Sequence, residues 1–167
     1  MYQTGDKVIY GMHGVCTVAD MEKRTVDGKT VIYLVLEPEG QSGSRFMVPT
    51  HNAAAMGKVR QVLSGEEMEA LLASELVRLD VWTPDEGRRK QQYRELIGSG
   101  NREKLAQMIC SLYRFRREQT AAGKKLHMCD ENFLRDAEKL LSGEIASTLE
   151  IPPAEALQYL RKKLGSI

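Results

Sequence analysis

Hydrophobic and polar residues alternate in short runs through the first fifty residues, which is the pattern of β-strands. The runs occupy residues 6–10, 15–26, 30–37 and 45–49. An Asp-Gly pair at positions 27 and 28 separates the second run from the third and is a strong signal for a tight hairpin. Four or five strands in so short a segment predict a small, strongly bent antiparallel sheet, a β-barrel of the SH3 or Tudor type.

The period of the pattern becomes helical after Asn52. Apolar residues then recur every three or four positions in residues 65–76, 84–97, 101–119, 129–149 and 152–164. The sequence TPDE at 83–86 has the form of a capping box, with Thr83 as N-cap, Pro84 at the first helical position and Glu86 at the third. These runs predict a bundle of about four helices after a linking helix.

The predicted fold class is therefore α+β in two domains, a small SH3/Tudor-like antiparallel β-barrel followed by an all-α helical bundle. The expected boundaries are 1–60 for the barrel, 61–82 for the linking helix and 83–167 for the bundle. With 167 residues in total, each half is close to the lower limit for burying its own core.

Charge is unevenly distributed along the chain, although the formal net charge is only +1. Acidic residues outnumber basic ones in 1–84, and basic residues outnumber acidic ones in 85–167. This asymmetry indicates an anionic partner for the second half. No apolar run approaches the roughly 18 residues of a membrane span, and the N-terminus lacks the features of a signal peptide, so we expect a cytoplasmic protein without a membrane partner.

Motifs for catalysis and for metal binding are incomplete. Cys16, Cys110 and Cys129 are far apart and contain no C-x-x-C spacing, which predicts reduced thiols. The GKT at 28–30 lacks the earlier glycine of a phosphate loop, because that position is Lys23. No nucleophile signature is present. We therefore expect no enzymatic activity, no metal, no cofactor and no small-molecule substrate.

The only tryptophan, Trp82, precedes a cluster of basic residues in the helix that follows, and a second stretch, YRFRR at 113–117, interleaves aromatic residues with arginine. Such clusters can bind phosphates and stack on unpaired bases. From spacing alone, a solvated helix surface with the aromatic residues packed in the core is the favoured interpretation. The alternative is a DNA-binding surface made of Trp82, Arg88, Arg89, Lys90, Arg114 and Arg117.

The ordered series of motifs resembles the CarD/CdnL family of bacterial RNA polymerase-binding transcription regulators. The matching segments are GDKVIYGMHGVCTV, YLVLEP, FMVP, RRKQQYRELIGSG and AEKLLSGEIA. The resemblance implies a Tudor-like N-terminal domain, shared with the transcription-repair coupling factor, that binds the polymerase β subunit. It also implies a helical C-terminal domain that contacts promoter DNA at the upstream edge of the transcription bubble.

The resemblance further implies roles for individual residues in the first domain. Arg24 takes a position that contacts the β subunit. Met47 takes a second contact position that is basic in the family. Arg45 lies two residues earlier, on the same face of the strand, and could replace that basic contact.

In the second domain, Arg88 and Arg89 match the basic pair that approaches the DNA backbone in the family. The family's wedge tryptophan is replaced by Glu86, and Trp82 lies four residues earlier. Either the local backbone brings Trp82 to the same place, or this chain has lost the wedge.

The sequence thus predicts a transcription regulator that docks on the β subunit and stabilises the promoter open complex. The main rival is a protein adaptor on the polymerase whose helical domain does not contact the DNA fork, which the substitution by Glu86 favours. An RNA-binding barrel and a small enzyme are weaker rivals. Activation or repression, the target promoters and the oligomeric state all remain open.

Overall fold

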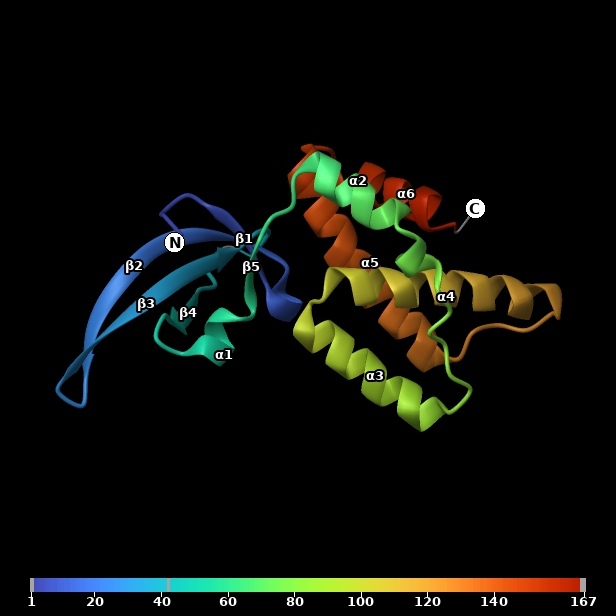
Figure 1. Ribbon diagram of the computed structural model, residues 1–167, viewed down its shortest axis with the longest axis horizontal. Coiled ribbons are helices and arrows are strands. Elements are labelled where there is room, and N and C mark those ends of the chain that lie inside the picture. The colour runs from blue at the N-terminus through green and yellow to red at the C-terminus, as the bar shows by residue number, and fades with distance from the viewer. Residues whose placement is uncertain (1, 42, 166–167) are drawn as a thin grey trace. The chain divides into compact units, whose positions relative to one another are not determined.

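The computed structural model describes residues 2–41 and 43–165, and the chain divides into two compact units, Met1–Val62 and Leu63–Ile167 (Figure 1). The elements of the first unit are β1 (Lys7–Tyr10), the 3-10 helix η1 (Gly11–His13), β2 (Val15–Val26), β3 (Lys29–Pro38), β4 (Phe46–Pro49), α1 (Ala53–Met56) and β5 (Val59–Gln61). The elements of the second are α2 (Gly65–Ala73), the 3-10 helix η2 (Glu75–Arg78), α3 (Glu86–Ser99), α4 (Arg102–Ala121), α5 (Met128–Leu149) and α6 (Pro153–Leu164).

The first unit is an antiparallel sheet of five strands in the order β4-β3-β2-β1-β5. Its longest pairing is the β2–β3 hairpin, which runs from Cys16 opposite Pro38 to Val26 opposite Lys29. Since β4 and β5 are the two edges and do not pair with each other in the described part of the chain, the sheet is open. The predicted antiparallel sheet is confirmed, whereas the predicted closed barrel is not.

The hairpin turn lies at the Asp-Gly pair, as the sequence predicts. Asp27 has a φ of 51° and Gly28 a φ of 76°. A two-residue type I′ turn requires positive φ at both central positions, and Asp-Gly tolerates it. The turn sets the register of the two long strands and so decides which side chains share a face of the sheet.

The main apolar cluster of the first unit lies on one face of the sheet. It consists of Val8, Cys16, Val18, Leu34, Leu36, Val48 and Val59. Burial, together with the nearby charge of Glu39, raises the pKa of the Cys16 thiol to about 11. Cys16 is therefore a protonated core residue at neutral pH, and its thiol is expected to react slowly with alkylating reagents.

The second unit is helical, and the four helices predicted beyond residue 83 are present as α3, α4, α5 and α6. The apolar stripes of α4 and α5 supply most of the core, which includes Leu105, Met108, Ile109, Leu112, Phe133, Leu134, Ala137 and Leu141. The segment predicted as a linking helix is only partly helical. Its helical part, α2, belongs to the second unit and packs against α5 and α6.

The predicted capping box at the start of α3 is wrong. The N-cap is Asp85, whose Oδ1 accepts a hydrogen bond of 3.2 Å from the backbone N–H of Arg88. The carbonyl groups of Thr83 and Pro84 instead accept hydrogen bonds of 3.0 and 3.1 Å from the Arg89 guanidinium. These bonds from a side chain hold residues 83–84 outside the helix.

Candidate functional site

Trp82 lies half-buried in the segment between η2 and α3, where it packs against α4. Its ring stacks on Phe115, with 4.1 Å between ring centroids and 25° between ring planes. The guanidinium carbon of Arg89 lies 4.9 Å from the centroid of the Trp82 ring. The indole Nε1 is buried and finds no hydrogen-bond partner among the described residues. Trp82 is therefore a packing residue of the helical unit, with part of its ring still exposed.

Arg89 is buried, and all three nitrogens of its guanidinium donate hydrogen bonds to other residues. Its Nε and Nη2 donate to the two carboxylate oxygens of Asp130 at 3.0 and 3.1 Å. The Tyr93 hydroxyl donates to the same carboxylate at 2.6 Å. Burial lowers the pKa of Arg89, but the hydrogen bonds and charge of Asp130 outweigh that effect and raise it. We therefore assign Arg89 a structural role, holding α3 on α5, in place of the predicted DNA contact.

The two basic residues that flank Arg89 point to solvent. Arg88 is exposed, and no ion pair to its side chain is found in the described ranges. The Lys90 side chain is 52% exposed and pairs with Glu86 at 3.4 Å. Since an exposed i,i+4 pair contributes only about 0.3–0.5 kcal/mol, Lys90 can leave Glu86 for a phosphate at little cost.

Glu86 stands at the position that the resemblance assigns to the family's wedge tryptophan. Glu86 is the exposed first residue of α3 and also accepts a hydrogen bond of 3.7 Å from the Cys129 thiol. Burial, with Asp130 and Glu86, raises the pKa of Cys129 and keeps it protonated as a donor. Trp82, four residues earlier, packs on Phe115 and lies beside the Arg89 guanidinium.

The predicted basic residues of α4 hold neighbouring segments. Arg114 donates to the carbonyl oxygen of Arg78 at 2.8 Å and lies 3.9 Å from the Asp80 carboxylate. Arg117 donates to the carbonyl oxygen of Gly165, at the end of α6. Both side chains remain partly or fully exposed, so each can contact a phosphate while it keeps its backbone acceptor.

Several basic residues of the second unit lie at one end of it. α3 begins, and α4 and α6 end, at the same end of the unit (Figure 1). The Trp82–Phe115 stacking connects the start of α3 to the second half of α4. The contribution of α6 was not predicted, although the RKK run at 161–163 is a visible signal in the sequence. We name this end, formed by Trp82, Arg88, Lys90, Arg114, Arg116, Arg117, Arg161 and Lys162, the basic end.

In the first unit, the strand register places all three predicted polymerase-contact residues on one face of the sheet. Arg24 lies opposite Val31, and Met47 lies opposite Val35. Because alternate residues of a strand share a face, Val31 and Val35 put Arg24 and Met47 on the same side. Arg45, just before β4, forms an ion pair of 3.0 Å with Glu37, which belongs to that side as well.

This face of the hairpin, which we name the arginine face, combines exposed charge with exposed apolar surface. The Arg24 side chain is 57% exposed and pairs with Glu22 at 3.0 Å. Val26, two residues further along β2, is 43% exposed. Val31 and Tyr33 are half-buried between them and Met47. Apolar patches with a charged rim are typical of protein–protein contact surfaces.

Two further buried carboxylates of α5 tie the helices of the second unit together. Glu138 accepts hydrogen bonds from the Tyr113 hydroxyl of α4 at 2.6 Å and from Arg161 of α6 at 2.8 Å. Glu144 pairs with Arg102 at the start of α4. Asp130 in turn pairs with Arg89 of α3, so three buried carboxylates of α5 together hold α3, α4 and α6. These groups are all satisfied within the protein, which indicates structural roles.

The two buried tyrosines predict an alkaline limit to stability. Burial, followed by hydrogen bonding to Asp130 and Glu138, raises the pKa of Tyr93 and Tyr113 far above the usual value of about 10. The unfolded chain therefore loses these protons first, so the free energy of unfolding should be constant up to about pH 10 and should fall above it. Urea unfolding between pH 8 and 11.5 measures this.

The matched control for this prediction is the double variant Tyr93→Phe/Tyr113→Phe, which removes both titrating hydroxyls. Its stability should be lower at pH 8 and should fall less steeply above pH 10. An equal pH dependence in the two proteins would show that other groups cause the alkaline loss.

Within the residues that the structure describes, no helix is both long enough and apolar enough to cross a membrane, and no cluster of three or more His, Cys, Asp or Glu side chains could hold a metal ion.

Residues 2–62 match the family CarD-like/TRCF RID domain. Residues 82–161 match the family CarD, C-terminal domain. The two matches follow each other in order and together cover most of the chain. The chain therefore belongs to the CarD/CdnL family and is a CarD-type transcription regulator.

Proposed function

We propose that this regulator binds the RNA polymerase β subunit through its first unit, binds promoter DNA at the upstream edge of the transcription bubble through its second, and stabilises the open complex. The observation that carries the proposal is the presence of both CarD domains, in order, in one chain. The exposed arginine face supports the polymerase contact. The basic end, which includes Arg88, supports the DNA contact. Neither role requires catalysis.

The free energy of one contact to an unpaired base is large enough to shift the equilibrium of promoter opening. Separating one DNA base step costs on average about 1.4 kcal/mol. A stacking contact to an unpaired base contributes about 1–3 kcal/mol, so one such contact shifts the equilibrium toward the open complex about tenfold. Contacts to phosphates carry no sequence information, so the ease with which each promoter melts would decide which promoters respond.

Arg24→Glu is expected to weaken binding to RNA polymerase at least tenfold, because it puts a negative charge at the centre of the proposed contact. The matched control is Lys23→Glu, which makes the same change one residue away on the opposite face of β2. Competition binding to the purified polymerase compares the two variants. Equal losses for Arg24→Glu and Lys23→Glu would exclude the arginine face as the binding surface.

A second candidate function is a protein adaptor on the polymerase whose helical unit leaves the DNA fork alone. The packing of Trp82 on Phe115 and the burial of Arg89 favour it, because two of the predicted DNA contacts then serve the fold. Salt dependence separates the two functions. If the helical unit binds several phosphates, the affinity of the protein for a promoter complex falls steeply between about 50 and 200 mM salt, and more steeply than its affinity for polymerase alone. If the protein is an adaptor, the salt dependence of its affinity is the same with and without DNA.

A further inference from the structure

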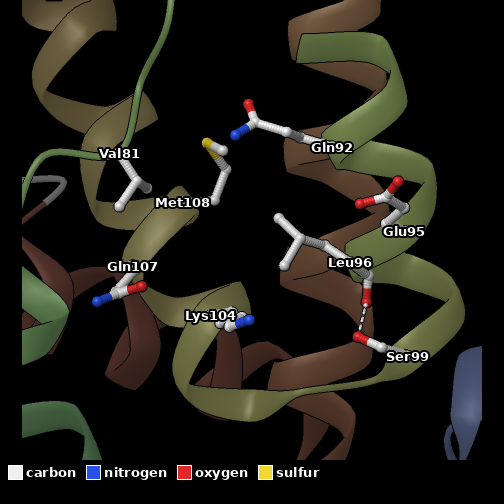
Figure 2. Close-up of a pocket in the computed structure, with 8 residues that line it drawn as sticks. All are labelled: Val81, Gln92, Glu95, Leu96, Ser99, Lys104, Gln107 and Met108. Atoms are coloured by element: carbon white, nitrogen blue, oxygen red, sulfur yellow. Dashed lines mark hydrogen bonds between the residues drawn. The ribbon is translucent and has the colours of Figure 1, made fainter. Parts of the chain in front are cut away.

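A pocket of about 430 Å³ opens between the second half of α3 and the first half of α4 (Figure 2). Its volume lies within the range of natural small-molecule sites. It is lined by Val81, Gln92, Glu95, Leu96, Ser99, Lys104, Gln107 and Met108. Of these residues, the function proposed above uses none.

The inner part of the pocket is apolar. Val81 from the segment before α3, Leu96 from α3 and Met108 from α4 point toward one another in Figure 2. Gln107 turns its amide away from them and donates to the carbonyl oxygen of Leu76 at 2.8 Å. The pocket therefore offers three aliphatic or thioether side chains to an apolar group of a ligand.

The α3 wall offers one carboxylate, that of Glu95. The Oε1 atom of Gln92 is buried and finds no partner among the described residues. Figure 2 shows the Gln92 amide with its nitrogen on the side of Met108 and its oxygen turned away, so this oxygen is not the atom that a ligand in the pocket meets. Glu95, one turn further along α3, has a carboxylate whose Oε1 accepts a bond of 3.3 Å from Gln91 and whose charge is not paired with a cation in the described chain.

The α4 wall offers one cation. The ammonium group of Lys104 lies at the pocket, and its charge is not paired with a carboxylate within the described residues. One unpaired anion on α3 and one unpaired cation on α4 thus face a shared apolar floor. A ligand that matches this pattern carries an ammonium group, a carboxylate and an apolar side chain.

We propose that this pocket binds a small zwitterion with an apolar side chain, of the class of the aliphatic α-amino acids. Its ammonium group donates to Glu95, its carboxylate pairs with Lys104, and its side chain contacts Leu96 and Met108. The volume of the pocket accommodates such a molecule with its bound water. Val81 lines the pocket and immediately precedes Trp82. A bound ligand therefore contacts the segment that contains Trp82.

The test is titration of the full-length protein with L-leucine, followed by the fluorescence of Trp82, the single tryptophan, and by methyl spectra of methionine-labelled protein. Saturable changes with a dissociation constant of about 1 mM or lower are expected, with the Met108 methyl signal shifted most. Glu95→Gln and Lys104→Met should each weaken binding about tenfold, because each removes a charged hydrogen-bond partner. Glu103→Gln, an exposed neighbour outside the pocket, should bind as the wild type does.

Two ligand controls complete the test. Isoamylamine lacks the carboxylate and isocaproate lacks the ammonium group, and both should bind at least tenfold more weakly than leucine. Absence of saturable change, or equal affinity of leucine for the wild type and both charge variants, would overturn the proposal. The experiment contains neither polymerase nor DNA, so its result is independent of the function proposed above.

Discussion

Asp130→Ala is expected to destabilise the helical unit by about 3–5 kcal/mol, because it leaves the Arg89 guanidinium buried without its counter-charge. Arg89 and Asp130 are 2% and 0% exposed, so water cannot replace the lost carboxylate. The Tyr93 hydroxyl loses its acceptor in the same step. Urea unfolding followed by circular dichroism measures the loss.

The matched control for this prediction is Asp136→Ala, which removes an exposed carboxylate from the same helix and should change stability by less than about 0.5 kcal/mol. The triple variant Arg89→Met/Asp130→Leu/Tyr93→Phe replaces the whole polar cluster with apolar groups. It should be more stable than Asp130→Ala alone, because no charge is left unpaired. A loss below about 1 kcal/mol for Asp130→Ala would contradict the structural role given to Arg89.

Trp82→Ala is expected to lower the free energy of unfolding of the helical unit by about 2–3 kcal/mol, below the range for a fully buried aromatic residue because Trp82 is half-exposed. The variant loses the stacking on Phe115 and the cover over the Arg89 guanidinium. Trp82→Phe keeps a ring in place and should lose less than half as much. Denaturant unfolding of the three proteins, followed by circular dichroism, provides the comparison.

This prediction bears on how function is assigned to Trp82. A loss of open-complex stabilisation in Trp82→Ala reports on DNA contact only if the helical unit is still folded under the assay conditions. Unchanged stability in Trp82→Ala, within about 0.5 kcal/mol, would mean that the stacking on Phe115 is not maintained in solution, and would return Trp82 to the role of an exposed contact residue.

Local features of the fold were predictable from the sequence because they depend on local physics. The Asp27–Gly28 turn follows from the positive φ that these two residues tolerate. The apolar stripes of α4 and α5 follow from helical periodicity. Closure of the sheet depends on whether two strands far apart in sequence pair, and the alternation within each strand holds no information about that.

The start of α3 shows how a distant residue overrides a local signal. Thr83 and Asp85 are both good N-cap residues, and the TPDE pattern favours Thr83. Hydrogen bonds from Arg89 to the carbonyl groups of residues 83 and 84 decide for Asp85. Arg89 is itself held by a carboxylate 41 positions away in sequence, which no local pattern reveals.

The candidate site was predictable in its residue types and only partly in their roles. The basic cluster at 88–90 is visible in the sequence, but adjacent residues of a helix point about 100° apart, so the three side chains cannot all face the same partner. In the structure Arg89 is buried against α5, whereas Arg88 and Lys90 are exposed to solvent. That Arg24, Arg45 and Met47 share one face of the sheet could not be predicted, because it depends on the pairing register of β2, β3 and β4.

The most direct test of the central claim is the lifetime of promoter open complexes formed by the polymerase of the same organism, measured after challenge with a competitor. The wild-type protein should lengthen the lifetime about tenfold. Arg88→Glu should abolish most of that gain, whereas Lys139→Glu, the same change at an exposed position on α5, should keep it. A lifetime that the wild-type protein leaves unchanged while it is bound to the polymerase would contradict the claim and establish the adaptor function instead.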